Sequence, residues 1–208
     1  HAKHVVKGAP NTFVIGDMPF GTYNVSIEEA VRNANKLFME SGCDCIKLEG
    51  GSDMAPVIKA IVKAGIPVCA HIGLTPQSAA MMGGFKVQGK SLEAAQELLD
   101  SARAVEEAGA FMVVLEGIPK MLADVITEKL SIPTMGIGAG AGCDMQVLVA
   151  QDMLGMNEWV PKFVKKYADL HKIIIDAYNQ YVKESNERTF PDHDTQYNAV
   201  IEGIENLK

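Results

Sequence analysis

Short apolar runs alternate along the chain with longer stretches in which apolar residues recur every three or four positions. Each short run ends at a glycine, a proline or a charged residue, which is typical of a buried strand. The longer stretches have the spacing of amphipathic helices that pack on a sheet. The expected strands are residues 12–17, 45–49, 68–73, 111–116 and 134–140, and a sixth element over 147–150 fits either a strand or a helix.

The expected helices lie between these strands and after them. Ser26 and Glu29 form a capping box at the start of the first. The chain also opens with a segment that has the pattern of a helix end, closed by Gly8 and Pro10. The helices are predicted over residues 27–41, 54–64, 91–108, 119–129 and 162–184, with a further one possible near 195–207.

Strands that alternate with helices predict a parallel β/α architecture, and the repeated unit favours a (β/α)8 TIM barrel over a doubly wound sheet. A barrel of this kind needs eight strands. The chain begins at His1 in the middle of a helical pattern, so we expect upstream residues that supply the first two strands. We predict one domain over residues 1–208, with strands 3–8 and their helices in 1–161 and C-terminal helices and a tail in 162–208.

Composition narrows the class of protein. The net charge is −7, with 48% hydrophobic and 22% charged residues, which is ordinary for a soluble protein and argues against a general nucleic-acid or membrane-surface binder. No apolar run approaches the length of a membrane span, and no secretory signal is evident, so we expect a cytoplasmic protein. The four cysteines lack zinc-site spacing and are expected to be buried hydrophobes.

The strand over residues 45–49 contains two charges that a buried strand should not hold. Lys47 and Glu49 are two positions apart, so their side chains share one face of the strand. Charged groups are buried only when they are paired or bind a metal or a substrate. Lys47 can serve as the structural partner of Glu49, or the two can divide the work between an acidic substrate and a divalent cation.

The other expected strands end in the same way. Asp17, His71 and Glu116 each lie at the C-terminal end of a strand, which is the end where barrel enzymes carry their catalytic groups. Glu116, a lone carboxylate in an apolar setting, suits general acid–base chemistry. Asp17 can instead cap a turn, and His71 is as readily a hydrogen-bonded structural histidine. Carboxylates without a Cys/His cluster favour a hard cation such as Mg²⁺.

Two irregular stretches complete the pattern. Residues 73–90 show no period, and a loop of this length in a compact domain is usually functional. Residues 136–141 nominally fit the dinucleotide fingerprint, but they occur late in the chain and no following strand presents a ribose-binding acid. We interpret them as a tight turn that admits a ligand at the barrel mouth.

These segments together resemble one enzyme family. Asp17-Met18-Pro19-Phe20, Lys47-Leu48-Glu49-Gly50-Gly51, His71-Ile72-Gly73-Leu74-Thr75-Pro76-Gln77, Gly84-Phe85-Lys86-Val87-Gln88-Gly89, Leu115-Glu116 and Gly136-Ile137-Gly138-Ala139-Gly140 occur in the order found in the 3-methyl-2-oxobutanoate (ketopantoate) hydroxymethyltransferases. The resemblance runs from His1 to about His193. It implies a barrel of the phosphoenolpyruvate/isocitrate-lyase type, assembled as a homodecamer in many members.

The resemblance also implies a reaction and a set of roles. The family transfers a hydroxymethyl group from 5,10-methylenetetrahydrofolate to 3-methyl-2-oxobutanoate with Mg²⁺, giving 2-dehydropantoate for pantothenate and coenzyme A biosynthesis. By position, Asp17 and Glu49 are expected at the metal, Asp17 and Lys47 at the keto acid, and Glu116 as the catalytic proton acceptor.

The chain departs from the family pattern at its front. The family has an upstream segment that carries a further metal-binding aspartate and a substrate-binding serine, and neither is present in residues 1–208. Two alternatives therefore stay open: another carbon–carbon lyase or phosphonomutase of the same superfamily that acts on a 2-oxo acid, and an inactive truncated barrel.

Overall fold

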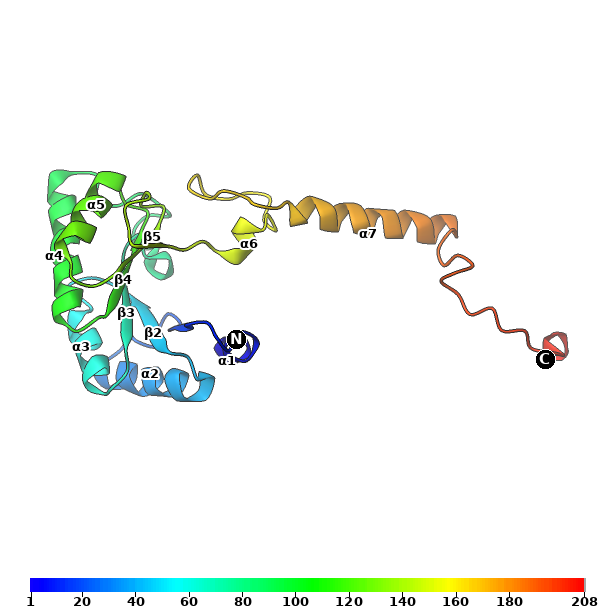
Figure 1. Cartoon of the computed structure of the whole chain (residues 1–208), viewed down its shortest axis with the longest axis horizontal. Helices are drawn as coiled ribbons and strands as arrows, with labels where there is room; N and C mark the ends of the chain where they lie inside the picture. Colours follow the sequence, from blue (N-terminus) through cyan, green and yellow to red (C-terminus); the bar gives the residue numbers. More distant parts are fainter. Residues whose placement is uncertain (208) are drawn as a thin grey trace. The chain divides into compact units, whose positions relative to one another are not determined.

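The computed structural model describes residues 1–207, and its internal contacts divide the chain into two units, His1 to Val147 and Leu148 onward. The first unit contains the β/α alternation that the sequence predicts, as Figure 1 shows. The prediction of a single domain over residues 1–208, subdivided after residue 161, stays a prediction.

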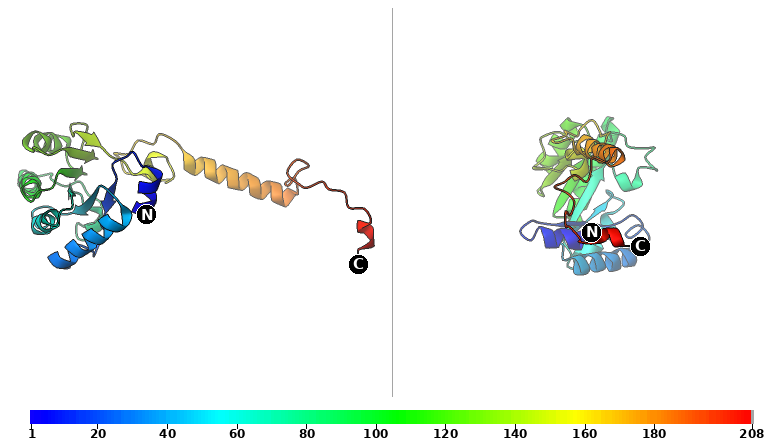
Figure 2. Two further views of the ribbon diagram at one scale, coloured as in Figure 1. Left: turned by 60° about the horizontal axis from the view of Figure 1, so that its bottom comes forward. Right: turned by 90° about the vertical axis from the view of Figure 1, so that its right-hand side faces the viewer.

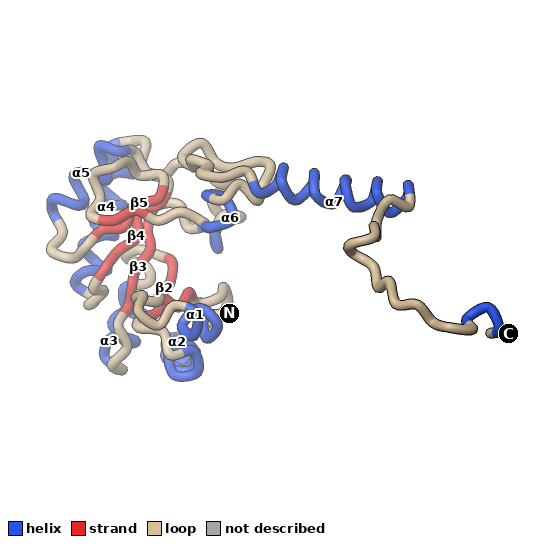
Figure 3. Tube along the Cα trace, turned by 45° about the vertical axis from the view of Figure 1, so that its right-hand side comes forward, coloured by secondary structure: helices blue, strands red, loops and turns tan. Residues whose placement is uncertain are grey.

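One sheet of six parallel strands forms the centre of the first unit, in the order β1-β2-β3-β4-β5-β6. The strands are β1 (Ile15–Asp17), β2 (Cys45–Glu49), β3 (Val68–Gly73), β4 (Met112–Glu116), β5 (Thr134–Ile137) and β6 (Met145–Gln146). Parallel strands in sequential order are the arrangement of a barrel, whereas a doubly wound sheet reverses its strand order at a switch point. The described strands therefore form part of a barrel, and Figure 3 shows them as a red layer among blue helices.

Helices follow the first four strands in turn and lie along one face of the sheet (Figure 2). The capping box predicted for α2 is present, since Ser26 Oγ accepts a hydrogen bond from the Glu29 N–H at 3.2 Å. Ser91 caps α4 in the same way through Ala94. The helices of this unit are α1 (Ala2–Gly8), α2 (Ile27–Ser41), α3 (Ala55–Lys63), α4 (Leu92–Glu107) and α5 (Lys120–Lys129).

Alternation along the strands gives the sheet two different faces. Ile46 and Leu48 of β2 belong to the large core between the sheet and the helices, whereas Cys45 belongs to a smaller apolar cluster on the opposite face. The buried members of this second cluster are Cys45, Cys69, Met112, Val114 and Ile137. Further along the same face are Lys47 and Glu49 of β2, His71 and Gly73 of β3, and Glu116 of β4, so the apolar cluster underlies the charged strand ends.

The predicted boundaries are wrong mainly toward the C-terminus. The sixth strand is Met145–Gln146, not 147–150, because its position is set by pairing with β5 and not by an apolar run of its own. The helix expected over 162–184 is α7 (Leu170–Glu187), which begins where Asp169 caps it through the Lys172 N–H. Of the helix considered near 195–207, only the 3-10 turn η2 (Ile204–Asn206) is present.

The second unit is dominated by α7, which follows the short helix α6 (Ala150–Met153). No residue of α7 is buried, and the apolar side chains of Ile173, Ile174 and Tyr178 are exposed. Within residues 1–207, none of the helices combines the length and the apolar character needed to cross a bilayer. The helix thus presents apolar surface of the kind that protein contacts commonly cover.

Asp144 is expected to make the β5–β6 edge sensitive to acid. Its Oδ2 accepts hydrogen bonds from the N–H and the hydroxyl of the buried Thr134, at 2.8 and 3.1 Å. These bonds, the backbone one most strongly, lower the pKa of the Asp144 carboxyl below its usual 3.8. A lowered pKa in the folded state adds stability above the usual pKa, and this stability is lost as the pH falls through the lowered value.

Asp144→Asn should therefore reduce the free energy of unfolding at neutral pH by about 1 kcal/mol, and the difference from the unmodified protein should shrink in acid. Urea unfolding at neutral pH and near about pH 3 measures both effects. Glu128→Gln, at an exposed position on α5, is the matched control. An Asp144→Asn effect of the same size at both pH values would contradict the role of the carboxylate.

Candidate active site

The register of the strands brings the charged strand ends together. Asp17 pairs with Lys47 across β1 and β2, and Glu49 pairs with His71 across β2 and β3. Glu116 of β4 pairs with Gly73, which lies two residues beyond His71. Because side chains two positions apart share a face, all of these polar groups project on the face that carries the smaller apolar cluster.

The Lys47 ammonium is the centre of this group. Its Nζ lies 2.9 Å from Asp17 Oδ1 and 3.8 Å from Glu49 Oε1. It also lies 3.4 Å from His71 Nδ1. The side chain of Asp17 is 52% exposed, whereas those of Lys47 and Glu49 are 16% and 4% exposed. Lys47 therefore neutralises a buried carboxylate on one side and an accessible carboxylate on the other.

His71 connects the two halves of the site. Its Nδ1 lies 3.7 Å from Glu49 Oε1, and its Nε2 lies 3.2 Å from Glu116 Oε2. The second pair is within ion-pair distance, but its alignment is not that of a hydrogen bond, and within residues 1–207 His71 Nε2 has no other partner. Lys47 can only donate, so its contact with Nδ1 places the proton of a neutral ring on Nε2, toward Glu116.

The sequence-predicted residues Asp17, Lys47 and Glu49 thus lie in one constellation, and Glu116 joins it through His71. His71, which the sequence left between a structural and a functional role, lies between Glu49 and Glu116. Sequence reasoning missed two further contributors: Gln77, whose backbone N–H donates to Glu49 Oε2 at 2.9 Å, and Tyr23, whose hydroxyl donates to Gln77 Oε1 at 2.7 Å. The length of the 73–90 loop and the resemblance over residues 71–77 pointed to this segment, but neither gave Gln77 a role.

Burial keeps the other ionisable groups around the site neutral. Burial raises the pKa of Tyr23 to about 12, and the neighbouring carboxylates of Glu49 and Asp17 add to the rise. Burial also raises the pKa of Cys69 to about 12, against an opposing effect of the Lys47 charge, and that of Cys45 to about 12. The thiols beneath the charged layer are therefore neutral, which agrees with their predicted role as buried hydrophobes.

The glycine-rich turn of residues 136–141, together with Gly142, lies close to α5. A Cβ at Gly140 would lie 2.6 Å from Lys120 Cγ, and one at Gly142 would lie 1.9 Å from Asp124 Oδ1. Lys120 and Asp124 of α5 are bound to each other at 2.5 Å. At Gly140 and Gly142 the lack of a side chain therefore admits the side chains of α5. The interpretation of residues 136–141 as a tight turn that admits a ligand stays a prediction.

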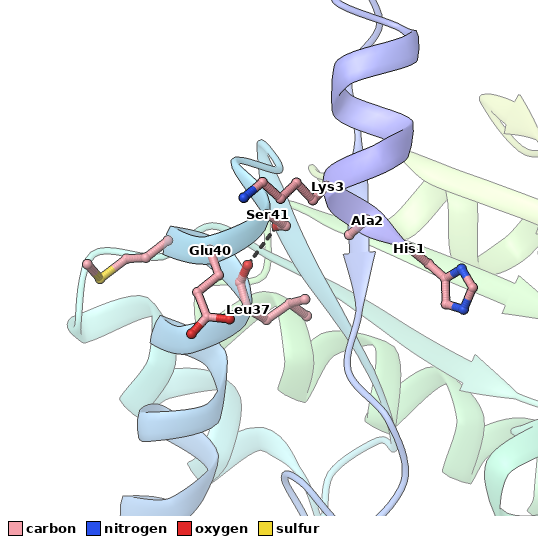
Figure 4. A pocket seen from close by; sticks show the side chains of 7 residues that line it. His1, Ala2, Lys3, Leu37, Glu40 and Ser41 are labelled. Carbon is pink, nitrogen blue, oxygen red and sulfur yellow. Dashed lines mark hydrogen bonds between the residues drawn. The ribbon is translucent and has the colours of Figure 1, made fainter.

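One groove in the first unit lies away from these residues. It has a volume of about 580 Å³ and is formed by α1 and the end of α2, as Figure 4 shows. Its lining residues are His1, Ala2, Lys3, Leu37, Met39, Glu40 and Ser41. None of them belongs to the cluster at the strand ends, so the groove is a feature of the helical layer.

The carboxylates of Asp17 and Glu49 are ligands of the type that a hard divalent cation prefers. Mg²⁺ prefers oxygen ligands and is often held by one or two carboxylates together with water and substrate, and Asp17 and Glu49 offer two carboxylates on either side of Lys47. Within residues 1–207 there is no group of three or more His, Cys, Asp or Glu side chains arranged to hold a metal. These two carboxylates can thus supply part of a coordination shell.

Sequence comparisons relate the chain to one family of enzymes. A family model described as ketopantoate hydroxymethyltransferase matches residues 1–193. A 3-methyl-2-oxobutanoate hydroxymethyltransferase of Heliobacterium modesticaldum is 58% identical over 192 residues, covering 92% of this chain and 70% of the relative. A protein of the same name from Enterococcus faecalis is 52% identical over 208 residues, covering 100% of this chain and 76% of the relative.

Solved structures support the predicted barrel fold. Phosphonopyruvate hydrolase is similar with a TM-score of 0.50 and 13% identity, over 96% of this chain and 70% of that one. A putative phosphonomutase from Burkholderia cenocepacia is similar with a TM-score of 0.52 and 15% identity, over 88% and 75% of the two chains. At such low identity the likeness concerns the fold alone.

Gly73 offers a test of how the site is assembled. Its φ is +93°, and a Cβ there would lie 2.3 Å from the backbone oxygen of Glu116. Gly73→Ala should lower the free energy of unfolding by about 1–3 kcal/mol through strain, and further through this clash. Gly65→Ala is the matched control, because Gly65 has the same φ of +93° with nothing within 4 Å of its added Cβ.

Thermal unfolding of the two variants separates the loss of stability caused by backbone strain from the loss caused by the close approach of the added Cβ to Glu116. We expect a lower Tm for Gly73→Ala than for Gly65→Ala. Equal losses of Tm would mean that the approach of β3 to β4 at Glu116 does not restrict this position.

Proposed function

Because the chain belongs to the ketopantoate hydroxymethyltransferase family, we propose that it transfers a hydroxymethyl group to 3-methyl-2-oxobutanoate and so forms 2-dehydropantoate, a step in the biosynthesis of pantothenate and coenzyme A. Membership of this family makes the protein a transferase enzyme, as the sequence predicts. The observation that carries the proposal is the cluster in which Lys47 lies between two carboxylates and His71 leads on to Glu116.

The half of the site around Lys47 suits a 2-oxo acid. The substrate is an anion, and the Lys47 ammonium supplies the positive charge that a carboxylate requires. Asp17 is accessible and Glu49 is buried beside it, so the proposed Mg²⁺ would be held by these two side chains. When bound, Mg²⁺ polarises the keto group and stabilises the enolate formed next to it.

The half of the site around Glu116 suits proton abstraction. Glu116 takes the proton from C3 of the substrate, and the electrons of that C–H bond form the enolate. His71 Nε2 lies 3.2 Å from Glu116 Oε2, so the imidazole adjoins the proposed base. Water releases the one-carbon unit of 5,10-methylenetetrahydrofolate, our proposed donor, as formaldehyde; both C–N bonds to the folate break and tetrahydrofolate leaves. The enolate carbon then attacks the formaldehyde carbon, and the former water oxygen takes up a proton to become the new hydroxyl group.

We further propose a cytoplasmic homo-oligomer, a homodecamer by analogy with the family. The exposed apolar side chains of α7, including Ile173, Ile174 and Tyr178, support a protein contact there. The four cysteines are free and buried, which suits a reducing compartment.

Exchange of the C3 hydrogen of 3-methyl-2-oxobutanoate in D₂O tests the proton-abstraction step without the folate. The protein should exchange this hydrogen in the presence of Mg²⁺, and Glu116→Gln should reduce the rate by about 10²- to 10⁴-fold because the base is lost. Glu128→Gln, at an exposed position, should leave the rate unchanged. No exchange by the unmodified protein, or undiminished exchange by Glu116→Gln, would refute the mechanism.

The same reaction separates the alternatives. Formation of 2-dehydropantoate should require 5,10-methylenetetrahydrofolate, whereas a carbon–carbon lyase or phosphonomutase would turn over its own 2-oxo acid without folate. An inactive truncated barrel would show neither exchange nor product.

Lys47→Met should weaken binding of the keto acid. The variant keeps an apolar stem but removes the ammonium that contacts Asp17, Glu49 and His71. Loss of a charge-assisted contact should raise the KM for 3-methyl-2-oxobutanoate by about 10- to 100-fold. Lys129→Met, at an exposed position on α5, is the control. Equal KM values for the two variants would exclude a substrate role for Lys47.

A further inference from the structure

Gln77 lies where two loops of the site meet. It is the middle residue of the 3-10 turn η1 (Pro76–Ser78), which follows β3. Its backbone N–H donates to Glu49 Oε2 at 2.9 Å, and Glu49 is only 6% exposed. One oxygen of this buried carboxylate is therefore fixed by the turn, while the other faces Lys47 and His71.

The side chain of Gln77 reaches in another direction, to the loop between β1 and α2. Its Nε2 donates to the carbonyl oxygen of Met18 at 3.0 Å, and its Oε1 accepts from the Tyr23 hydroxyl at 2.7 Å. Met18 and Tyr23 are each 1% exposed. The amide of Gln77 thus donates through its nitrogen and accepts through its oxygen, and so joins two buried groups of this loop.

The partner of the Gln77 amide adjoins Asp17. Met18 follows Asp17 directly, and its own N–H donates to the carbonyl of Lys47 at 2.9 Å. The residue after Asp17 is thus held to β2 through its N–H and to Gln77 through its carbonyl. Gln77 is thus hydrogen-bonded both to Glu49 and, through Met18, to the loop that follows Asp17.

We propose that Gln77 is a positioning residue, which sets the placement of the Asp17 carboxylate relative to the Glu49 carboxylate. This inference rests on the proposed function, because it takes those two groups as the binding site for the cation and the keto acid. Gln77 itself touches neither; it acts through the backbone next to Asp17 and through the carboxylate of Glu49.

The physical basis is the cost of leaving buried polar groups without partners. If the amide is removed, the Met18 carbonyl and the Tyr23 hydroxyl lose their partners away from water. Burial raises the pKa of Tyr23 to about 12, so the phenol remains a neutral donor and cannot avoid this loss by ionising. The loop must then move to find other partners, and Asp17 moves with it.

Gln77→Met is the variant that isolates the amide. It has nearly the same volume and keeps the backbone N–H that binds Glu49, but it removes the link to Met18 and Tyr23. The double variant Gln77→Met/Tyr23→Phe also removes the unpaired hydroxyl, so it should recover part of the stability without restoring the link. Gln96→Met is the matched control, because Gln96 is exposed on α4 and its amide binds only Asp100.

Three measurements on the purified protein test the proposal: Mn²⁺ binding by electron paramagnetic resonance, the KM and kcat for 3-methyl-2-oxobutanoate, and the Tm. Gln77→Met should raise the Mn²⁺ dissociation constant and the KM by about tenfold each, because the net contribution of about one hydrogen bond is lost. The change in kcat should be smaller. In the double variant the Tm should rise again while the Mn²⁺ dissociation constant stays high.

A purely structural role predicts a different outcome, in which Mn²⁺ affinity returns together with the Tm in the double variant. That result would overturn the proposal. Two other results would also overturn it: equal Mn²⁺ dissociation constants for Gln77→Met and Gln96→Met, and no Mn²⁺ binding by the unmodified protein. If Mn²⁺ binds and responds to Gln77→Met but the C3 hydrogen never exchanges, the proposed reaction fails and the positioning role stands.

Discussion

The site depends on one ammonium group held among acceptors from three neighbouring strands. Lys47 contributes the charge, and Asp17, Glu49 and His71 surround it. Without Lys47, the buried carboxylate of Glu49 would face the imidazole of His71 with no cation beside it, and an unpaired buried charge is far more costly than a paired one. The same ammonium lies above the neutral thiols of Cys45 and Cys69, which form a layer of low polarity that strengthens each contact above it.

Strand spacing divides this arrangement into two halves. Glu49 is on β2 and Glu116 on β4, so β3 lies between them and separates their backbones by about 10 Å. His71 of β3 occupies the interval and approaches a carboxylate with each ring nitrogen. Glu49, which lies near the Lys47 ammonium, and Glu116, the proposed proton acceptor, are therefore kept apart by the imidazole of His71. This geometry suits a reaction that stabilises an enolate on one side and removes a proton on the other.

Much of this could be predicted from the sequence, because its causes are local. Strand alternation places Lys47 and Glu49 on one face, and the β/α order places the ends of parallel strands at one edge, so the cluster follows from pattern alone. The contacts of Gln77 could not be predicted, because they join loops that are far apart in the sequence and no period encodes them. Strand β6 was misplaced for a related reason, since pairing with β5 defines it and its two residues carry no strand pattern.

The long irregular segment after β3 can be explained by the same division. Near its start, Gln77 binds Glu49; near its end, the N–H of Gln88 donates to the carbonyl of Gly117 at 2.9 Å, next to Glu116. A helix over residues 74–90 would use its backbone groups internally, and a strand would pair them with a neighbouring strand. An irregular segment leaves those groups available, and its glycines allow the close approaches that result, as at Gly89 against Leu98 and Leu122. The absence of a repeating pattern over residues 73–90 is thus what allows this segment to connect the two halves of the site.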